Sequence, residues 1–285
     1  MTPHPYALAD VFTDRPLAGN QVAVFLQGER LDEELLQKIA LEMNLSETTF
    51  VFPAADGADA AVRLFSTVVE VPWAGHPLLG TAVVLAREAE EHTRTWHLAT
   101  PGGVIPIRTE RLDEVTYNAS MQQPIPKVTA FEKADELLAV LGLEASLLPV
   151  EVQDAGIPHT YVTAPTVEFV ESLVPDWPRL REVLQDRRLS VFAHDGRGGV
   201  VSRMLSPKDR VPEDPACGSA AGPLAAHLLR HGRIASGQEI TIAQGAQVGR
   251  PSVLYAIATG SPKHIENIEV RGGVCLIGGG ALNLG

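Results

Sequence analysis

Apolar and polar positions in the first half of the chain alternate between helical and strand-like spacing. Residues 32–43 repeat apolar side chains along one helical face, and Asn44 follows, so the pattern predicts a helix that ends there. Residues 78–91 predict a second helix, with Pro77 suited to its first turn. β-Branched and aromatic runs around these helices predict strands at residues 22–25, 48–52, 63–69, 93–99, 103–108 and 115–121.

The second half repeats this mixture after a break at residues 123–127, where Pro124 and Pro126 disfavour any regular element. Helices are predicted at residues 131–141, stopped by Gly142, and at 219–231, capped by Gly232. Further strands are predicted at residues 158–163, 190–194, 200–205, 239–243 and 252–259.

Strands outnumber helices in both halves, which predicts an α+β fold and not a doubly wound parallel sheet. The break predicts two domains, residues 1–124 and 125–273, with a C-terminal strand at 274–285 that can pack back onto the first. Ala74-Gly75-His76-Pro77 and Cys217-Gly218-Ser219-Ala220 each open a helix, and their offset is 143 residues (217 − 74), half the chain. Two interpretations stay open: unrelated tight turns, or a duplicated domain whose two helix N-termini face one cleft.

Composition limits the classes of partner. The chain has 285 residues and a net charge of −12, which argues against nucleic acid or an anionic membrane as a partner. Its two cysteines, Cys217 and Cys275, cannot form a disulfide framework, so a reducing compartment is expected. No signal peptide is predicted, and the longest apolar stretch, residues 78–86, is about half a membrane span. We therefore expect a soluble, cytoplasmic protein.

The residues that could bind a ligand or transfer a proton lie in or near the turns that open two of the predicted helices. A helix N-terminus attracts anions through its unpaired N–H groups, and Gly75 and Gly218 allow a ligand to approach the backbone closely. Glu47 lies in an apolar stretch, which would raise its pKa and suit a general base that also returns its proton. His76 and Asp214 are further titratable candidates. The alternatives are a solvated Glu47 at a helix–strand junction and a His76 that only caps a helix.

Three other patterns predict no site. His227 and His231 have the spacing of a zinc-binding pair, but Leu228 replaces the glutamate of H-E-x-x-H, so they are expected on the helix surface as partners of its C-terminal dipole. Residues 278–280 lack the spacing of a dinucleotide-binding loop. Ser219 has no local His or Asp of a catalytic triad, so a hydrolase is not predicted.

Three ordered motifs carry a family resemblance. They are Leu45-Ser-Glu-Thr-Thr-Phe-Val51, Val71-Pro-Trp-Ala-Gly-His-Pro-Leu-Leu-Gly-Thr-Ala82 and Glu213-Asp-Pro-Ala-Cys-Gly-Ser-Ala-Ala-Gly222. Together they resemble the PhzF family of phenazine biosynthesis, and the likeness extends from residue 10 to residue 252. Two positions depart from the family pattern: Cys217 stands where threonine is usual, and Gln21 where proline often follows Gly-Asn.

The resemblance implies a diaminopimelate-epimerase-like fold of two similar α+β domains, each wrapping its sheet around a central helix, in a homodimer without cofactor or metal. It implies an isomerase of a small carboxylate, trans-2,3-dihydro-3-hydroxyanthranilic acid, that moves a proton from C3 to C1 of the ring. The implied catalytic residues are Glu47 as acid/base, supported by His76, Asp214 and Ser219. The implied substrate-binding residues are Gly75, Gly218, Ser46 and Asn20.

Cys217 raises an alternative, because amino-acid epimerases of this fold carry a catalytic cysteine at that turn. A two-base epimerase needs a thiol on each face of the carbon, and the matching position of the first turn is Ala74. Cys217 is therefore expected to be a small residue that fills the turn. Two other functions stay open: an isomerase or epimerase of another small amino or enol acid, and a non-catalytic small-acid binding protein.

Overall fold

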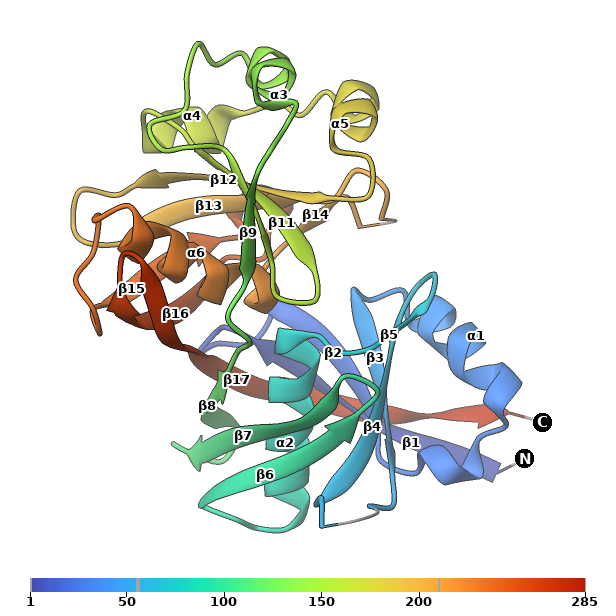
Figure 1. The fold of residues 1–285 in the computed structure, drawn as a ribbon. Helices are drawn as coiled ribbons and strands as arrows, with labels where there is room; N and C mark the ends of the chain where they lie inside the picture. The colour runs from blue at the N-terminus through green and yellow to red at the C-terminus, as the bar shows by residue number, and fades with distance from the viewer. Residues whose placement is uncertain (1, 55–56, 210, 285) are drawn as a thin grey trace. The chain divides into compact units, whose positions relative to one another are not determined.

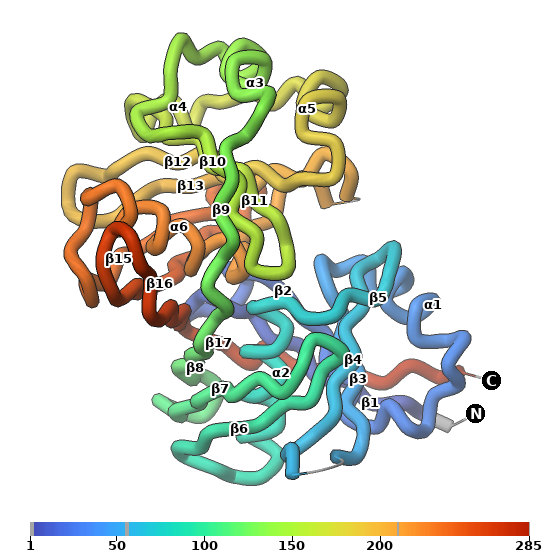
Figure 2. Tube along the Cα trace, viewed as in Figure 1, coloured from blue at the N-terminus to red at the C-terminus, as the bar shows by residue number. Residues whose placement is uncertain are grey.

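The computed structural model describes residues 2–54, 57–209 and 211–284 (Figures 1 and 2). The chain divides into two compact units, residues 1–122 with 271–285, and residues 123–270. The sequence prediction placed the boundary after residue 124 and the returning strand from 274. Among the described residues, no helix is long and apolar enough to cross a membrane.

In its described residues, the first unit is rich in strands and has two α-helices and one short 3₁₀ helix. Its elements are β1 (Thr2–Val11), β2 (Asn20–Phe25), η1 (Gly28–Arg30), α1 (Glu33–Met43), β3 (Glu47–Phe52), β4 (Ala60–Ser66), β5 (Glu70–Val71), α2 (Gly75–Glu88), β6 (Thr93–Thr100), β7 (Gly103–Arg111), β8 (Thr116–Gln122) and the second half of β17 (His264–Leu284). α2 begins three residues before the predicted start, so Pro77 lies inside its first turn, where its missing N–H costs no hydrogen bond.

The two faces of this sheet carry different helices, because successive side chains of a strand point to opposite faces. Phe25 and Phe50 stack with ring centroids 5.2 Å apart and pack in one core with Leu36 of α1. On the other face, α2 lies so close to β2 that a Cβ added at Gly80 would be 2.4 Å from Cγ1 of Val22. α2 is therefore the buried central helix of the unit, with strands around it (Figure 1).

The second unit repeats this plan. Its elements are β9 (Lys127–Ala130), α3 (Ala134–Leu141), β10 (Glu151–Asp154), β11 (Pro158–Thr163), α4 (Val167–Ser172), α5 (Trp177–Leu184), β12 (Arg188–His194), β13 (Val200–Leu205), β14 (Glu213–Asp214), α6 (Gly218–Arg230), β15 (Glu239–Gln244), η2 (Ala246–Val248), β16 (Ser252–Ser261) and the first half of β17. α6 is the central helix here, and every residue from Gly218 to Leu229 is buried.

The order of strand pairings is the same in the two units. From β1 to β7 the pairings run antiparallel, parallel, antiparallel, antiparallel, parallel and antiparallel, with β4 paired to both β5 and β6. From β10 to β16 they run in the same order, with β13 paired to both β14 and β15. The central helix follows the two-residue strand in each case. The two helix starts at Gly75 and Gly218 thus occupy equivalent places in the two units.

The faces of β10, β11 and β12 differ sharply in chemistry. Val152, Val162 and Val191 belong to one apolar core with the helices α3, α4 and α5. The alternate residues of the same strands are polar and lie towards α6: Glu151, Gln153, His159, Tyr161 and Ser190. This polar inner face positions the second group of candidate residues.

Sequence patterns missed the short helices α4 and α5 and predicted only the end of β17, at residues 274–285. β17 begins at His264 and contains Gly272, Gly273 and Gly279. A Cβ at Gly273 would lie 2.6 Å from the carbonyl oxygen of Thr13, and one at Gly279 would lie 2.4 Å from that of Tyr6. The glycines therefore allow close backbone packing against the first segment of the chain, where β1 pairs with Val274–Leu284. The short helices α4 and α5 begin at capping side chains, Thr166 and Asp176.

Candidate active site

Glu47 is placed by a reversal between α1 and β3. α1 ends at Asn44, whose left-handed backbone (φ 52°) turns the chain, and Glu47 is the first residue of β3. Ser46 lies half-buried in the bend directly before it. Oε2 of Glu47 is 3.5 Å from Nε2 of His76, the second residue of α2, and the Glu47 side chain is 13 % exposed.

Two neighbours fix the His76 ring. Nδ2 of Asn20, the first residue of β2, lies 3.2 Å from His76 Nδ1, and the carbonyl oxygen of Gln21 lies 3.3 Å from His76 Nε2. Since the Asn20 amide donates to Nδ1, the ring hydrogen belongs on Nε2, which donates to Gln21 and faces Glu47. Burial lowers the pKa of His76 to about 3, so the ring is neutral at pH 7. The structure therefore brings Asn20, Glu47 and His76 together.

Asp214 lies in the second unit, at the end of β14. Its Oδ1 accepts a hydrogen bond from the Ala216 N–H at 3.0 Å, and its carbonyl accepts one from the Gln244 side chain at 2.8 Å. Burial raises the pKa of Asp214 to about 6, although the Ala216 N–H works in the opposite direction. A carboxyl group with this pKa is present in both protonation states near neutral pH.

Cys217 precedes α6 and contacts Ser219. Its Sγ lies 3.3 Å from Ser219 Oγ, and the residue is 4 % exposed. Burial raises the pKa of the Cys217 thiol to about 12, and the nearby Asp214 carboxylate acts in the same direction. A thiol with this pKa is protonated at neutral pH, whereas a cysteine base or nucleophile must reach the thiolate form.

His159 is a neighbour of Ser219 that sequence reasoning missed. Its Nε2 lies 3.0 Å from Ser219 Oγ, and Tyr161, two residues further along β11, donates from its hydroxyl to the Ala220 carbonyl at 2.8 Å. No local pattern marked His159, because β11 reads Pro-His-Thr-Tyr-Val-Thr and Thr160 interrupts any alternation of polar and apolar residues.

The starts of the two central helices are alike. The residues that precede them, Ala74 and Cys217, have extended backbones, and neither side chain caps its helix in the described structure. Gly75 and Gly218 are buried, and the Gly218 carbonyl accepts a hydrogen bond from the Gln123 side chain at 2.9 Å. The first residue of the third strand differs between the units, since Glu47 of β3 corresponds to Arg188 of β12. The first residue of the third strand is therefore a carboxylate in the first unit only, so the two units do not provide a pair of equivalent acid/base groups.

Comparisons with known proteins identify the family. Residues 9–279 match the family model PhzC-PhzF, described as phenazine biosynthesis-like protein. The chain is 43 % identical over 281 residues to the trans-2,3-dihydro-3-hydroxyanthranilate isomerase of Pseudomonas fluorescens, covering 99 % of this chain and 100 % of that protein. It is 45 % identical over 269 residues to the isomerase of the same name from Pseudomonas aeruginosa, covering 94 % of this chain and 95 % of that protein.

This chain belongs to the PhzC-PhzF family. A crystal structure of a Bacillus anthracis phenazine biosynthesis protein of the PhzF family superposes on it with a TM-score of 0.87, covering 100 % of both chains at 22 % identity. The predicted α+β, diaminopimelate-epimerase-like fold, with a sheet around a central helix in each half, is confirmed.

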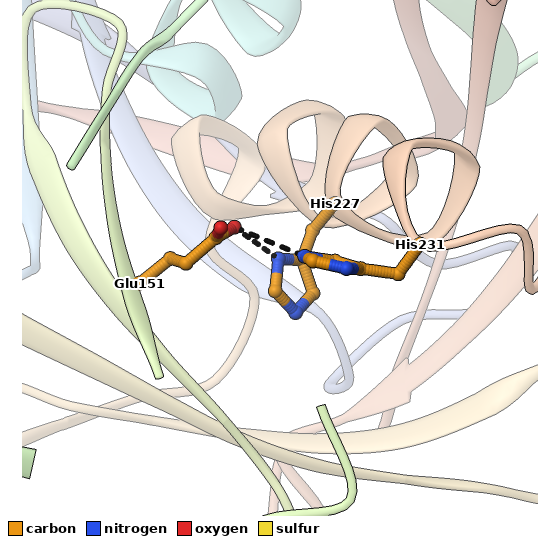
Figure 3. Close-up of side chains that lie close together, drawn as sticks. All are labelled: Glu151, His227 and His231. Carbon is orange, nitrogen blue, oxygen red and sulfur yellow. Dashed lines mark hydrogen bonds and ion pairs between the residues drawn. The ribbon is translucent and has the colours of Figure 1, made fainter. Parts of the chain in front are cut away.

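The PhzC-PhzF chain also brings Glu151 of β10 close to His227 and His231 at the end of α6 (Figure 3). His227 is fully buried, so the expectation that it lies on the helix surface is wrong; Tyr161 stacks on it, with ring centroids 5.7 Å apart. Glu151 Oε2 lies 3.1 Å from His227 Nδ1, 3.2 Å from His231 Nε2 and 2.9 Å from Arg230.

These three residues fit a metal ion poorly. Arg230 already donates to the carboxylate oxygen that a metal ion would use. A metal-bound histidine normally donates its second ring N–H to an acceptor, and His227 Nε2 is buried without a hydrogen-bond partner among the described residues. The geometry suits a hydrogen-bonded clamp between β10 and the end of α6.

Proposed function

We propose that the protein is a cofactor-independent isomerase that converts trans-2,3-dihydro-3-hydroxyanthranilate to the aminoketone precursor of phenazines. Two relatives at 43 % and 45 % identity, aligned over nearly their full lengths, carry this activity in their names. The observation that carries the proposal is the Glu47 carboxylate beside a neutral His76 that is fixed by Asn20 and Gln21.

Glu47 is the proton carrier in this proposal. Its carboxylate takes the proton from C3 of the ring, the double bonds shift, and the same carboxyl group returns the proton to C1. One C–H bond breaks and one forms, and the base is regenerated, so the step needs no oxidant or reductant. The resulting enol then tautomerises to the aminoketone.

The other residues support this transfer. His76 orients the Glu47 carboxylate while neutral, so no ion pair has to break when Glu47 takes up a proton. The N–H groups of Gly75 and Gly218 bind the substrate carboxylate, as helix N-termini favour anions. Ser46 and Asn20 contact the substrate, and Asp214 and Ser219 exchange hydrogen bonds with its polar substituents. Cys217 fills its turn as a protonated thiol.

The Glu47→Gln variant tests this role. It keeps the size and hydrogen bonding of the side chain but cannot accept a proton, so turnover falls by roughly 10²–10⁴-fold, as is typical when a general base is lost. Substrate binding, measured by calorimetry, is retained because the helix starts do not change. Glu42→Gln, at an exposed position of α1, is the matched control and keeps wild-type turnover. Near wild-type turnover of Glu47→Gln removes Glu47 from the mechanism.

Two properties complete the proposal. We propose a homodimer, because of the family resemblance. Light scattering of the protein as it elutes from a size-exclusion column tests this directly, and the mass of a monomer contradicts it. We propose a cytoplasmic location, which agrees with the two cysteines being free and buried, and cell fractionation tests it.

A further inference from the structure

Ser219 and His159 form a buried pair that resembles a serine nucleophile with its base. His159 Nε2 lies 3.0 Å from Ser219 Oγ. The His159 side chain has no exposed surface, and its Nδ1 is buried with no hydrogen-bond partner among the described residues. The direction of the hydrogen bond between the two residues decides what Ser219 can do.

The buried Nδ1 determines this direction. A hydrogen on Nδ1 would leave a buried N–H donor without an acceptor, which native structures rarely contain. A hydrogen on Nε2 leaves only a lone pair unpaired and lets the ring donate to Ser219. A charged imidazolium is disfavoured as well, because burial and the nearby Arg188 hold the pKa of His159 well below its usual range. The ring is therefore neutral, with its hydrogen on Nε2.

The repeat supplies a second observation. In the first unit, Asn20 at the start of β2 donates to the ring of His76, the second residue of α2. In the second unit, His159 at the start of β11 faces Ser219, the second residue of α6. Because the two strands occupy equivalent places in the repeat, each unit holds the second residue of its central helix by a hydrogen bond from its second strand.

We propose that His159 is a positioning residue that donates from Nε2 to Ser219 Oγ and so commits the Ser219 hydroxyl hydrogen to an anionic oxygen of the substrate. Ser219 is then a hydrogen-bond donor and not a nucleophile, since a nucleophilic serine needs an unprotonated Nε2 to accept its proton. In the free protein the hydroxyl faces Cys217 Sγ at 3.3 Å, a weak acceptor that an oxyanion readily replaces. The role of the substrate rests on the proposed isomerase function, whereas the direction of the hydrogen bond does not.

Nitrogen NMR of ¹⁵N-histidine-labelled protein tests the direction without any substrate. The His159 signals, assigned by their loss in His159→Gln, show a protonated Nε2 and a bare Nδ1 that do not titrate between pH 5 and pH 9. A hydrogen on Nδ1, or an imidazolium in this range, overturns the proposal even if the protein proves to be the expected isomerase.

Kinetics of four variants test the positioning. His159→Leu lowers kcat/KM by roughly tenfold to a hundredfold, close to the loss in Ser219→Ala, because each loses one directed hydrogen bond to a charged oxygen of the substrate. The double variant loses no more than Ser219→Ala alone. His159→Gln, which can place an amide N–H near the position of Nε2, stays within about threefold of the wild type. Circular dichroism checks that each variant is folded.

His227→Leu is the matched control, because it removes another buried imidazole, one that belongs to α6 itself and bonds to Glu151 and not to Ser219. Because the two residues act independently, the loss of kcat/KM in the double variant His227→Leu with Ser219→Ala should equal the product of the two single losses. Multiplying losses for His159→Leu and Ser219→Ala, or a His159→Gln variant as impaired as His159→Leu, overturn the positioning role. A wild-type protein inactive on the substrate, with the predicted His159 NMR signals, contradicts the proposed function and leaves the hydrogen-bond direction intact.

Discussion

The free energy of unfolding of Asp214→Asn, minus that of the wild type, should increase as the pH rises. The pKa of Asp214 is raised from 3.8 to about 6 in the folded protein, first of all by burial. The folded state therefore holds the carboxyl proton more tightly than the unfolded state. This stabilisation is complete below about pH 3.8 and is lost as the pH rises through about 6. The shift corresponds to about 3 kcal/mol in total, of which about 1 kcal/mol falls between pH 5 and pH 8.

Urea unfolding of wild type and Asp214→Asn at pH 5, 6, 7 and 8 measures this difference. The amide oxygen can still accept the Ala216 hydrogen bond, so the variant removes the titration and keeps the turn. Asp195→Asn is a matched control, because Asp195 also accepts an N–H from two residues ahead, at Arg197, but its pKa is lowered. Asp195→Asn should therefore show no gain with rising pH. A difference between wild type and Asp214→Asn that stays constant from pH 5 to pH 8 refutes the reasoning.

Three further predictions concern the thiol, a buried ion pair and metal ions. Cys217→Thr should keep isomerase activity within a few-fold, because the thiol is protonated and not a base; a thousandfold loss of kcat in a folded variant would make it catalytic. Arg203→Met should lower the free energy of unfolding in urea by about 3–5 kcal/mol, because it leaves the buried Glu213 carboxylate, 2.7 Å from the Arg203 guanidinium, without its partner; a loss below about 1 kcal/mol contradicts this. Dialysis against EDTA should leave activity unchanged, and activity restored only by added zinc would contradict it.

Elements with a clear local pattern could be predicted from the sequence, and elements defined by their surroundings could not. α1 has apolar residues on one face and a left-handed Asn44 at its end, so both its existence and its C-terminus follow from local chemistry. Only the end of β17 was predicted as a strand, at residues 274–285. Its continuation back to His264 was not, because Gly273 is explained only by the backbone of Thr13 lying against it. His227 was wrongly predicted to lie on the helix surface for a similar reason: nothing in the sequence around it shows that Tyr161 stacks on its ring.

The candidate site divides in the same way. Glu47, His76 and Asp214 stood out as titratable residues in apolar stretches, and the roles given to them came from the family resemblance. The contact between His76 and Asn20 joins residues 56 positions apart, and that between Ser219 and His159 joins residues 60 apart. Such pairs arise from the pairing of strands and the packing of the central helices, so no local pattern of one sequence contains them.

Proton NMR of trans-2,3-dihydro-3-hydroxyanthranilate with the purified protein in D₂O tests the central claim most directly. With the wild-type protein the C3–H signal should disappear and an aminoketone with a new hydrogen or deuterium at C1 should form. With Glu47→Gln the substrate spectrum should stay unchanged. An unchanged substrate spectrum with the wild-type protein, or recovered substrate that has only been inverted and deuterated at one carbon, would contradict the claim.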